Sequence, residues 1–315
     1  MFELQTEVEG MGHRFTYVVT PEEENEQLTV EWFLRRHGYS RHIITGLKRT
    51  EDGIFRNGVR AYTSQTVHAA DVIETHLVET EPSDGILPRP VPFSVVFEDH
   101  DILVVDKPAD TPIHPSIGNY ENTLANGIAW YFAQKDEPFV YRCINRLDRD
   151  TTGLIVLAKH ALSAAILSKA MRSREIHRTY QAFALGETDP SGTIDAPIAR
   201  LDGSLIQRTV DFSAGERSVT HYRTLAHYSG FSHLELNLET GRTHQIRVHM
   251  SYIGHPLLGD TLYNEAPGAF PRQALHSATL SFVHPITGEP LTFHAPLPED
   301  MQSFLLRNAF EKGFS

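Results

Sequence analysis

Cysteine is nearly absent from the sequence. Cys143 is the only cysteine among the 315 residues, so no disulfide can form within the chain. Such a composition is typical of a reducing compartment, and we expect a cytoplasmic protein. The usual zinc motifs need Cys pairs or regular His spacings, and the 18 histidines fit none of them. No metal site is therefore expected.

Long apolar runs are also missing. The longest, such as residues 154–158, fall far short of the roughly 20 residues that cross a bilayer. The first residues, MFELQTEVEG, lack the basic start and apolar core of a secretory signal. We expect no membrane partner. A Walker-type glycine loop is absent too, so Gly241 and Gly259 are interpreted as turn residues.

Positive charge is scarce overall. The 28 basic and 40 acidic residues give a net charge of -12, which argues against a polyanion partner, because phosphate binding depends on Lys and Arg. Residues 141–178 are the exception, since eight basic minus three acidic side chains leave a local charge of +5. Ordinary helix-surface charge would explain this cluster as well as a polyanion site would.

The length suits two domains better than one. Residues 79–90 are rich in Pro and acidic side chains and are typical of a linker. We therefore predict an extension over residues 1–26, a small domain over 27–78, a larger domain over 91–297 and a helical tail over 298–315.

Residues 27–78 carry a helix, helix, hairpin and strand pattern. The first helix is expected to end at Gly38, and Ser40 is a good N-cap for the second. Asn57-Gly58 between strand-like pieces predicts a tight hairpin, because both central residues need positive φ.

This order resembles the small RNA-binding domain named after ribosomal small-subunit protein four, although Ala70-Asp71 replaces the usual Gly-Asp. The resemblance implies that Arg41, Lys48 and Arg49 contact RNA. An accessory domain without an RNA role is the alternative, and the acidic character of residues 1–90 favours it.

The most informative segment is INRLDRDTTG, residues 144–153, which leads into an apolar strand. It places Asp148 between Arg146 and Arg149. Neighbouring guanidinium groups keep a carboxylate ionised, and a loop held by a rigid strand exposes it to substrate. Asp148 is therefore a candidate nucleophile or base, although a structural Arg–Asp contact would explain the tetrapeptide alone.

The segment resembles the catalytic motif of the RluA family of pseudouridine synthases, commonly His-Arg-Leu-Asp-x-x-Thr-Ser-Gly. Asn145 stands for the usual His, which puts any RNA contact of that His in doubt, and Thr152 stands for the usual Ser. Three further blocks follow the family's order: residues 101–108 with Ile113-His114-Pro115, Tyr180 after Arg178-Thr179, and residues 240–249 with 254–260.

The resemblance implies an α+β fold, with a mixed, mainly antiparallel sheet in the catalytic domain and a small α+β RNA-binding domain before it. It also implies an enzyme without a cofactor that converts uridine in structured RNA to pseudouridine. Ribosomal large-subunit RNA is the expected substrate, because relatives with this accessory domain often act there, and transfer RNA stays open. We expect a monomer.

The resemblance also assigns the site residues. Asp148, Tyr180 and Arg242 are expected to be catalytic: Arg242 pairs with Asp148, and Tyr180 stacks on the uracil. Substrate binding is expected from Arg146, Leu147, Ile246 and Arg247, and RNA binding from Arg149 in addition to the basic residues of the small domain.

Two alternatives belong to other classes of protein. A non-catalytic RNA-binding or ribosome-assembly protein could keep the fold, but the presence of Asp148, Tyr180 and Arg242 together argues against it. A hydrolase acting on another glycoside would need two carboxylates, and Asp150 would share a face with Asp148 if the loop is extended. The other three blocks argue against this alternative.

Overall fold

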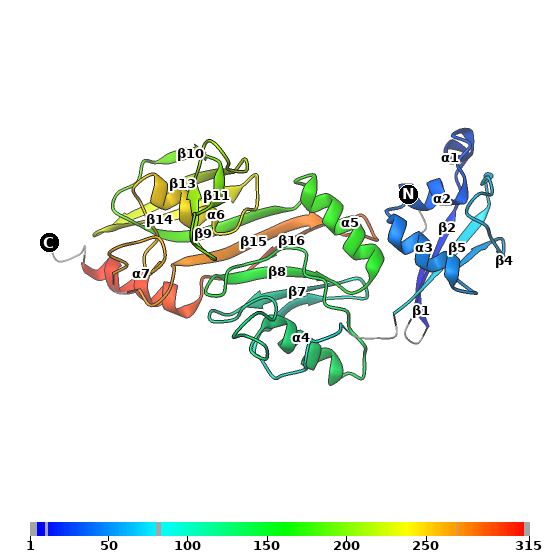
Figure 1. Cartoon of the computed structure of the whole chain (residues 1–315), viewed down its shortest axis with the longest axis horizontal. Helices are drawn as coiled ribbons and strands as arrows, with labels where there is room; N and C mark the ends of the chain where they lie inside the picture. Colours follow the sequence, from blue (N-terminus) through cyan, green and yellow to red (C-terminus); the bar gives the residue numbers. More distant parts are fainter. Residues whose placement is uncertain (1–4, 10–11, 80–82, 269, 312–315) are drawn as a thin grey trace.

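The computed structural model describes residues 5–9, 12–79, 83–268 and 270–311, which form a small body and a larger body that contact each other (Figure 1). Each combines helices with a sheet, and most strand pairs are antiparallel. The predicted α+β class is therefore confirmed. None of the described helices is long and apolar enough to cross a membrane.

The small body is a five-stranded antiparallel sheet in the order β1-β2-β5-β3-β4, with helices packed on it. Its elements are β1 Gln5–Glu9, β2 Gly12–Val18, α1 Pro21–Asn25, α2 Val30–Arg36, α3 Arg41–Arg49, β3 Ile54–Arg56, β4 Val59–Arg60 and β5 Val72–Val78. Phe15 of β2 and Ile73 of β5 share a buried core with Phe33 of α2 and Ile44 of α3.

Local sequence signals in this body are confirmed. The Ser40 hydroxyl accepts a hydrogen bond from the Ile43 amide at the start of α3, at 3.2 Å. Asn57 and Gly58 form the hairpin turn with φ values of 52° and 75°. The predicted boundary at residue 26 is wrong, because β2 lies inside the same sheet, between β1 and β5.

The larger body is built on one long sheet in the order β10-β13-β14-β9-β15-β8-β7-β6, with β16 paired to β15. Its strands are β6 Ser94–Glu98, β7 Ile102–Lys107, β8 Thr152–Ala158, β9 His177–Leu185, β10 Ser191–Asp195, β13 Val219–Tyr228, β14 Phe231–Leu238, β15 Leu275–Val283 and β16 Pro290–His294. The remaining elements are α4 Leu124–Ala133, α5 Ala161–Arg172, the hairpin of β11 Ile198–Arg200 and β12 Arg208–Val210, α6 Gln245–Tyr252 and α7 Glu299–Glu311. Within this sheet β8 and β15 run parallel, and the other pairs are antiparallel.

Strand β8 is buried along its whole length, because both faces of the sheet are covered there. Ile155 and Leu157 point into one core, which α4 and α6 complete. Leu154 and Val156 point into the other core, where Leu167 of α5 packs. This burial explains the continuous apolar run in the sequence and makes β8 a rigid support for the loop that precedes it.

The two bodies contact each other through the start of α5. Leu162 belongs to the core of the small body, and the rings of Phe15 and His160 lie 5.2 Å apart. The segment predicted as a linker also packs on the larger body, since the Ser83 hydroxyl accepts from the Tyr141 amide at 2.8 Å.

Candidate active site

The loops before β8 and before α6 meet in a cleft beside β9 and β15. Seven predicted residues line it: Arg146, Leu147, Asp148, Tyr180, Arg242, Ile246 and Arg247. The structure thus brings together every residue assigned to catalysis or substrate binding. Arg149 lies outside the lining and is exposed, paired with Asp110. Arg41, Lys48 and Arg49 lie on α3 of the small body, also exposed.

The partner of Asp148 differs from the predicted one. Arg247 Nη1 donates to Asp148 Oδ2 at 3.0 Å. Arg242 instead pairs with Glu216, at 2.5 Å, on the rim of the cleft. The predicted Arg242–Asp148 pair is therefore wrong. The reason is helical geometry: Arg242 precedes α6 and is exposed, whereas Arg247 lies in its first turn on the buried side.

Arg247 is held by a second carboxylate. Its Nε and Nη2 donate to the two oxygens of Asp260, at 2.7 and 2.8 Å, and Asp260 is fully buried. Its guanidinium also lies over the Tyr263 ring, 5.1 Å from the centroid. Burial lowers the pKa of Arg247, but hydrogen bonding and charge from Asp260 and Asp148 outweigh it and raise the pKa above its usual value. The cation therefore stays charged and fixed in orientation.

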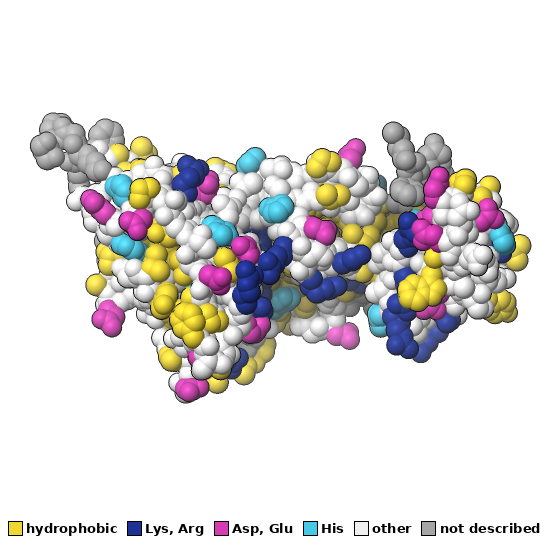
Figure 2. Space-filling model, turned by 90° about the horizontal axis from the view of Figure 1, so that it is seen from above, with side chains coloured by type: hydrophobic (Ala, Val, Ile, Leu, Met, Phe, Trp, Pro, Cys, Tyr) yellow, Lys and Arg dark blue, Asp and Glu magenta, His cyan; other side chains and the backbone are white. Residues whose placement is uncertain are grey.

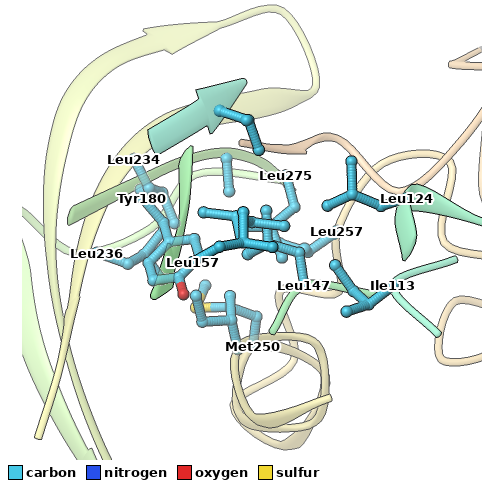
Figure 3. Packing of buried hydrophobic residues seen from close by; sticks show 14 of the residues in the cluster. Ile113, Leu124, Leu147, Leu157, Tyr180, Leu234, Leu236, Met250, Leu257 and Leu275 are labelled. Atoms are coloured by element: carbon cyan, nitrogen blue, oxygen red, sulfur yellow. The ribbon is translucent and has the colours of Figure 1, made fainter. Parts of the chain in front are cut away.

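Tyr180 comes from β9 and forms one wall of the cleft. The residue is only 4% exposed, and its ring lies among the aliphatic side chains of the core, near Leu157 and Leu236 (Figure 3). Burial raises the pKa of its hydroxyl and the charge of Asp148 adds to this effect, which outweighs the opposing influence of Arg178 and Ser277. Tyr180 therefore keeps its proton at neutral pH and presents an uncharged phenol.

Two residues fix the catalytic loop onto β8. The buried Asn145 side chain donates to the Leu154 carbonyl at 3.1 Å and accepts from the Val156 amide at 2.9 Å. Asn145 thus holds the loop on β8 and, at 3% exposure, presents no group to the cleft. Gly153 has φ of 111°, and a Cβ there would lie 2.3 Å from the Ser277 carbonyl of β15. Only glycine allows this close approach.

Lys107 holds the same loop in place by hydrogen bonds to backbone carbonyls. Its fully buried Nζ donates to the carbonyls of Pro108, Thr111 and Arg149, at 2.7, 2.9 and 2.8 Å. Burial lowers the pKa of Lys107 to about 7, although nearby carboxylates oppose this effect. The bond to Arg149 holds the residue next to Asp148.

Asp150 does not form a second carboxylate in the cleft. Its Oδ1 accepts from the Asp110 amide at 3.2 Å, and it is not among the cleft residues. Asp150 would share a face with Asp148 only in an extended loop, and this condition is not met, because the loop turns here: the Thr151 amide donates to the Asp148 carbonyl at 3.1 Å. This geometry gives no support to a two-carboxylate hydrolase.

Several residues of the site have no role predicted from the sequence, namely Lys107, His244, Asp260 and Tyr263. Asp260 and His244 lie in the third block that resembles the family, but the resemblance assigned them no role. Tyr263 follows that block, and nothing in its sequence context identifies it. Cys143 is partly buried beside the loop; burial raises the pKa of its thiol to about 12, which makes it unreactive.

Acid should destabilise the fold through His276, which packs behind the catalytic motif. Its Nδ1 lies 2.8 Å from the Thr152 hydroxyl and its Nε2 lies 3.2 Å from the Ala295 carbonyl. Burial lowers the pKa of His276 from 6.5 to about 4. The unfolded chain therefore binds more protons between these values, and stability should fall as pH drops from about 6.5 to 4, by about 2–3 kcal/mol from this residue.

Urea unfolding of the wild type and His276→Gln at pH 7, 6 and 5 would measure this effect. We expect a shallower loss of stability with acid in the variant. Equal slopes for the two proteins would contradict the assignment.

Basic side chains gather in the middle of the face shown in Figure 2 and on the small body, and acidic and histidine side chains lie beside and between them. Arg146 at the cleft is exposed, as are Arg41 and Lys48 on α3. The negative net charge therefore does not prevent a local positive field at the site.

Comparison with known proteins shows what the chain resembles. A family model described as RNA pseudouridylate synthase matches residues 101–252. The chain is 38% identical over 279 residues to "Uncharacterized RNA pseudouridine synthase YjbO" of Bacillus subtilis, covering 88% of this chain and 98% of that relative. It is 41% identical over 230 residues to ribosomal large subunit pseudouridine synthase D of Vibrio cholerae, covering 69% and 71% of the two chains.

Solved structures agree with this similarity. Human RNA pseudouridylate synthase domain containing 1 superposes with a TM-score of 0.55 at 25% identity, over 73% of this chain and 98% of that chain. Human RNA pseudouridylate synthase domain containing 4 gives a TM-score of 0.57 at 23% identity, over 69% and 93%, and so shows the same fold.

Proposed function

Since the chain belongs to the RNA pseudouridylate synthase family, we propose that it isomerises uridine to pseudouridine in large-subunit ribosomal RNA with Asp148 as the catalytic carboxylate. The family membership makes it an RNA pseudouridine synthase. Relatives named for the ribosomal large subunit, from Vibrio cholerae and Escherichia coli, support the choice of RNA. The role proposed for Asp148 rests on one observation. Its half-buried carboxylate lies in the cleft and is held in place by Arg247.

The two oxygens of Asp148 have different surroundings. Oδ2 is bound by Arg247, whereas Oδ1 has no hydrogen bond from any described residue. An oxygen left free in a cleft can act on a substrate, while the bound oxygen keeps the group oriented. Attack on ribose, attack on the base and removal of a ribose proton all require such a carboxylate oxygen.

The walls of the cleft suit a pyrimidine. Leu147 and Ile246 are buried apolar side chains, and Tyr180 adds an aromatic ring. A uracil inserted here would exchange stacking on its RNA neighbours for contact with these side chains. Since a paired uridine cannot be reached inside a helix, the target must be extruded from the RNA.

The proposal includes a monomeric enzyme in the cytoplasm. Each residue assigned to catalysis or substrate binding lies in the cleft of a single chain, so the proposed chemistry requires no residue from a second copy. Ribosomal RNA as substrate would place the enzyme in the cytoplasm. The reaction involves no redox step and no phosphoryl transfer, so no cofactor is needed for its balance.

RNA affinity should fall steeply as salt rises. Exposed Arg146, Arg41 and Lys48 are expected to contact phosphates, and each contact releases counterions on binding. With about three such contacts, raising salt from about 50 to 200 mM should weaken binding by roughly 20- to 40-fold.

Filter binding or fluorescence anisotropy at several salt concentrations measures this slope. The double substitution Arg41→Ala with Lys48→Ala should reduce the slope by about 1–2. A dissociation constant that stays constant with salt would exclude the predicted phosphate contacts.

Base-resolution pseudouridine mapping tests the proposed function. Purified protein would be incubated separately with unmodified large-subunit ribosomal RNA and with transfer RNA. We expect new pseudouridine in the ribosomal RNA. Product in transfer RNA alone would overturn the substrate, release of free uracil would favour a hydrolase, and binding without product would favour the assembly-protein alternative.

A further inference from the structure

His244 lies in the cleft but has no part in the function proposed above. It is the N-cap residue of α6, its side chain is 14% exposed, and it makes no capping hydrogen bond. Its backbone is left-handed, with φ of 59° and ψ of 17°. A residue with a Cβ adopts this conformation only at an energetic cost, and such strain concentrates at functional sites. The side chain is thus directed into the cleft at a cost to the backbone.

The hydrogen bonds of Tyr263 indicate the tautomer of His244. The Arg208 backbone N–H donates to the Tyr263 hydroxyl oxygen at 2.8 Å. His244 Nδ1 lies 2.8 Å from the same oxygen. Among the described residues, Nδ1 is the only acceptor within hydrogen-bond distance of this hydroxyl, so we assign the hydroxyl proton to the line toward Nδ1. Nδ1 therefore accepts, and the proton of the neutral imidazole is on Nε2.

The Nε2–H of His244 faces the reactive carboxylate without binding it. Nε2 lies 3.9 Å from Asp148 Oδ1, which is too long for a hydrogen bond. Burial lowers the pKa of His244, so the ring is uncharged at neutral pH and does not neutralise Asp148. A donor and a free carboxylate oxygen at this separation leave room for a substrate atom that meets both.

We propose that His244 is a further catalytic residue, whose Nε2–H donates a hydrogen bond to an oxygen of the target nucleotide beside the glycosidic bond. The inference rests on the proposed function. Two oxygens of the nucleotide can accept this hydrogen bond beside the glycosidic bond. They are the ribose 2′-hydroxyl, on the carbon next to C1′, and the 2-carbonyl of uracil, on the carbon next to N1. The hydrogen bond orients the nucleotide so that Asp148 Oδ1 reaches the reacting atoms.

A matched set of variants separates this role from a structural one. His244→Asn tolerates the left-handed backbone but is too short to place a donor at the Nε2 position, whereas His244→Gln carries an N–H at that distance. We expect His244→Asn and His244→Ala to lower the single-turnover rate about 10- to 100-fold, and His244→Gln to recover part of it. Tyr263→Phe, which frees the tautomer, should slow the reaction about three- to tenfold.

RNA affinity provides the control, because phosphate contacts dominate it. The dissociation constants of all four variants should stay within about threefold of the wild type. A His244→Ala rate within about twofold of the wild type, or a His244→Gln rate no faster than that of His244→Ala, would overturn the inference. Wild-type protein that forms no pseudouridine would instead overturn the proposed function itself.

Modified target nucleotides identify the oxygen. The single-turnover rates of the wild type and His244→Ala would be compared on RNAs that carry a uridine, a 2′-deoxyuridine or a 2-thiouridine at the target position. Loss of the His244 effect with the deoxy target assigns the 2′-hydroxyl, and loss with the thio target assigns the 2-carbonyl. An effect of equal size on all three RNAs would contradict contact with either oxygen.

Discussion

Asp148→Asn is expected to lower the single-turnover rate of pseudouridine formation by at least about a thousandfold. The amide keeps the size of the carboxylate and one oxygen, but it can neither attack nor take a proton as a carboxylate does. Asp148 is partly exposed in the cleft, so the substitution should leave folding intact. The measurement is the conversion of a saturated enzyme–RNA complex, followed by mapping of the target position.

Asp150→Asn is the matched control, two residues further along the same loop. Its carboxylate accepts from the Asp110 amide and lies outside the cleft lining, so the rate should change by less than about fivefold. RNA affinity should stay close to that of the wild type in both variants. Full activity of Asp148→Asn would remove the chemical basis of the account.

Arg247→Met should damage both catalysis and stability. The substitution leaves Asp260 fully buried without its cation and frees Asp148 to rotate. Removing one partner of a buried ion pair costs about 3–5 kcal/mol of unfolding free energy. Loss of orientation should also lower the rate at least about 100-fold. Chemical denaturation and single-turnover kinetics measure the two effects separately.

Arg247→Lys and Arg242→Met provide the comparison. The lysine keeps the charge but cannot bind Asp260 with two N–H groups and Asp148 with a third, so it should recover stability better than rate. Arg242 pairs with the exposed Glu216, so Arg242→Met should cost less than about 1 kcal/mol of stability. A larger loss of rate from Arg242→Met than from Arg247→Met would show that the ion pair seen here is not the catalytic one.

Local sequence signals predict helix starts and turns well where the residue type itself determines the local backbone structure. Ser40 begins a helix because its hydroxyl caps a free amide, and Asn57-Gly58 turns because both residues tolerate positive φ. The apolar run of β8 is buried on both faces, as its composition suggests. Pairing across the sheet is different, since β2 joins β5 far along the chain and no local pattern specifies this partner.

In the candidate site, too, the sequence predicts some features, while others depend on how distant segments pack. The motif around Asp148 and the position of Tyr180 lead to residues that share one cleft. The choice between Arg242 and Arg247 depends on where α6 begins and which of its sides is buried, and two arginines five residues apart in one block do not reveal this. Tyr263 reaches His244 through a loop whose path is set by Asp260, so its place in the site follows only from the folded chain.

The most direct measurement is a map of pseudouridine in ribosomal RNA from cells that lack this protein, before and after the wild type or Asp148→Asn is restored. The account predicts that at least one large-subunit position loses pseudouridine, that the wild type restores it, and that Asp148→Asn does not. Identical maps with and without the protein, or restoration by Asp148→Asn, would contradict it.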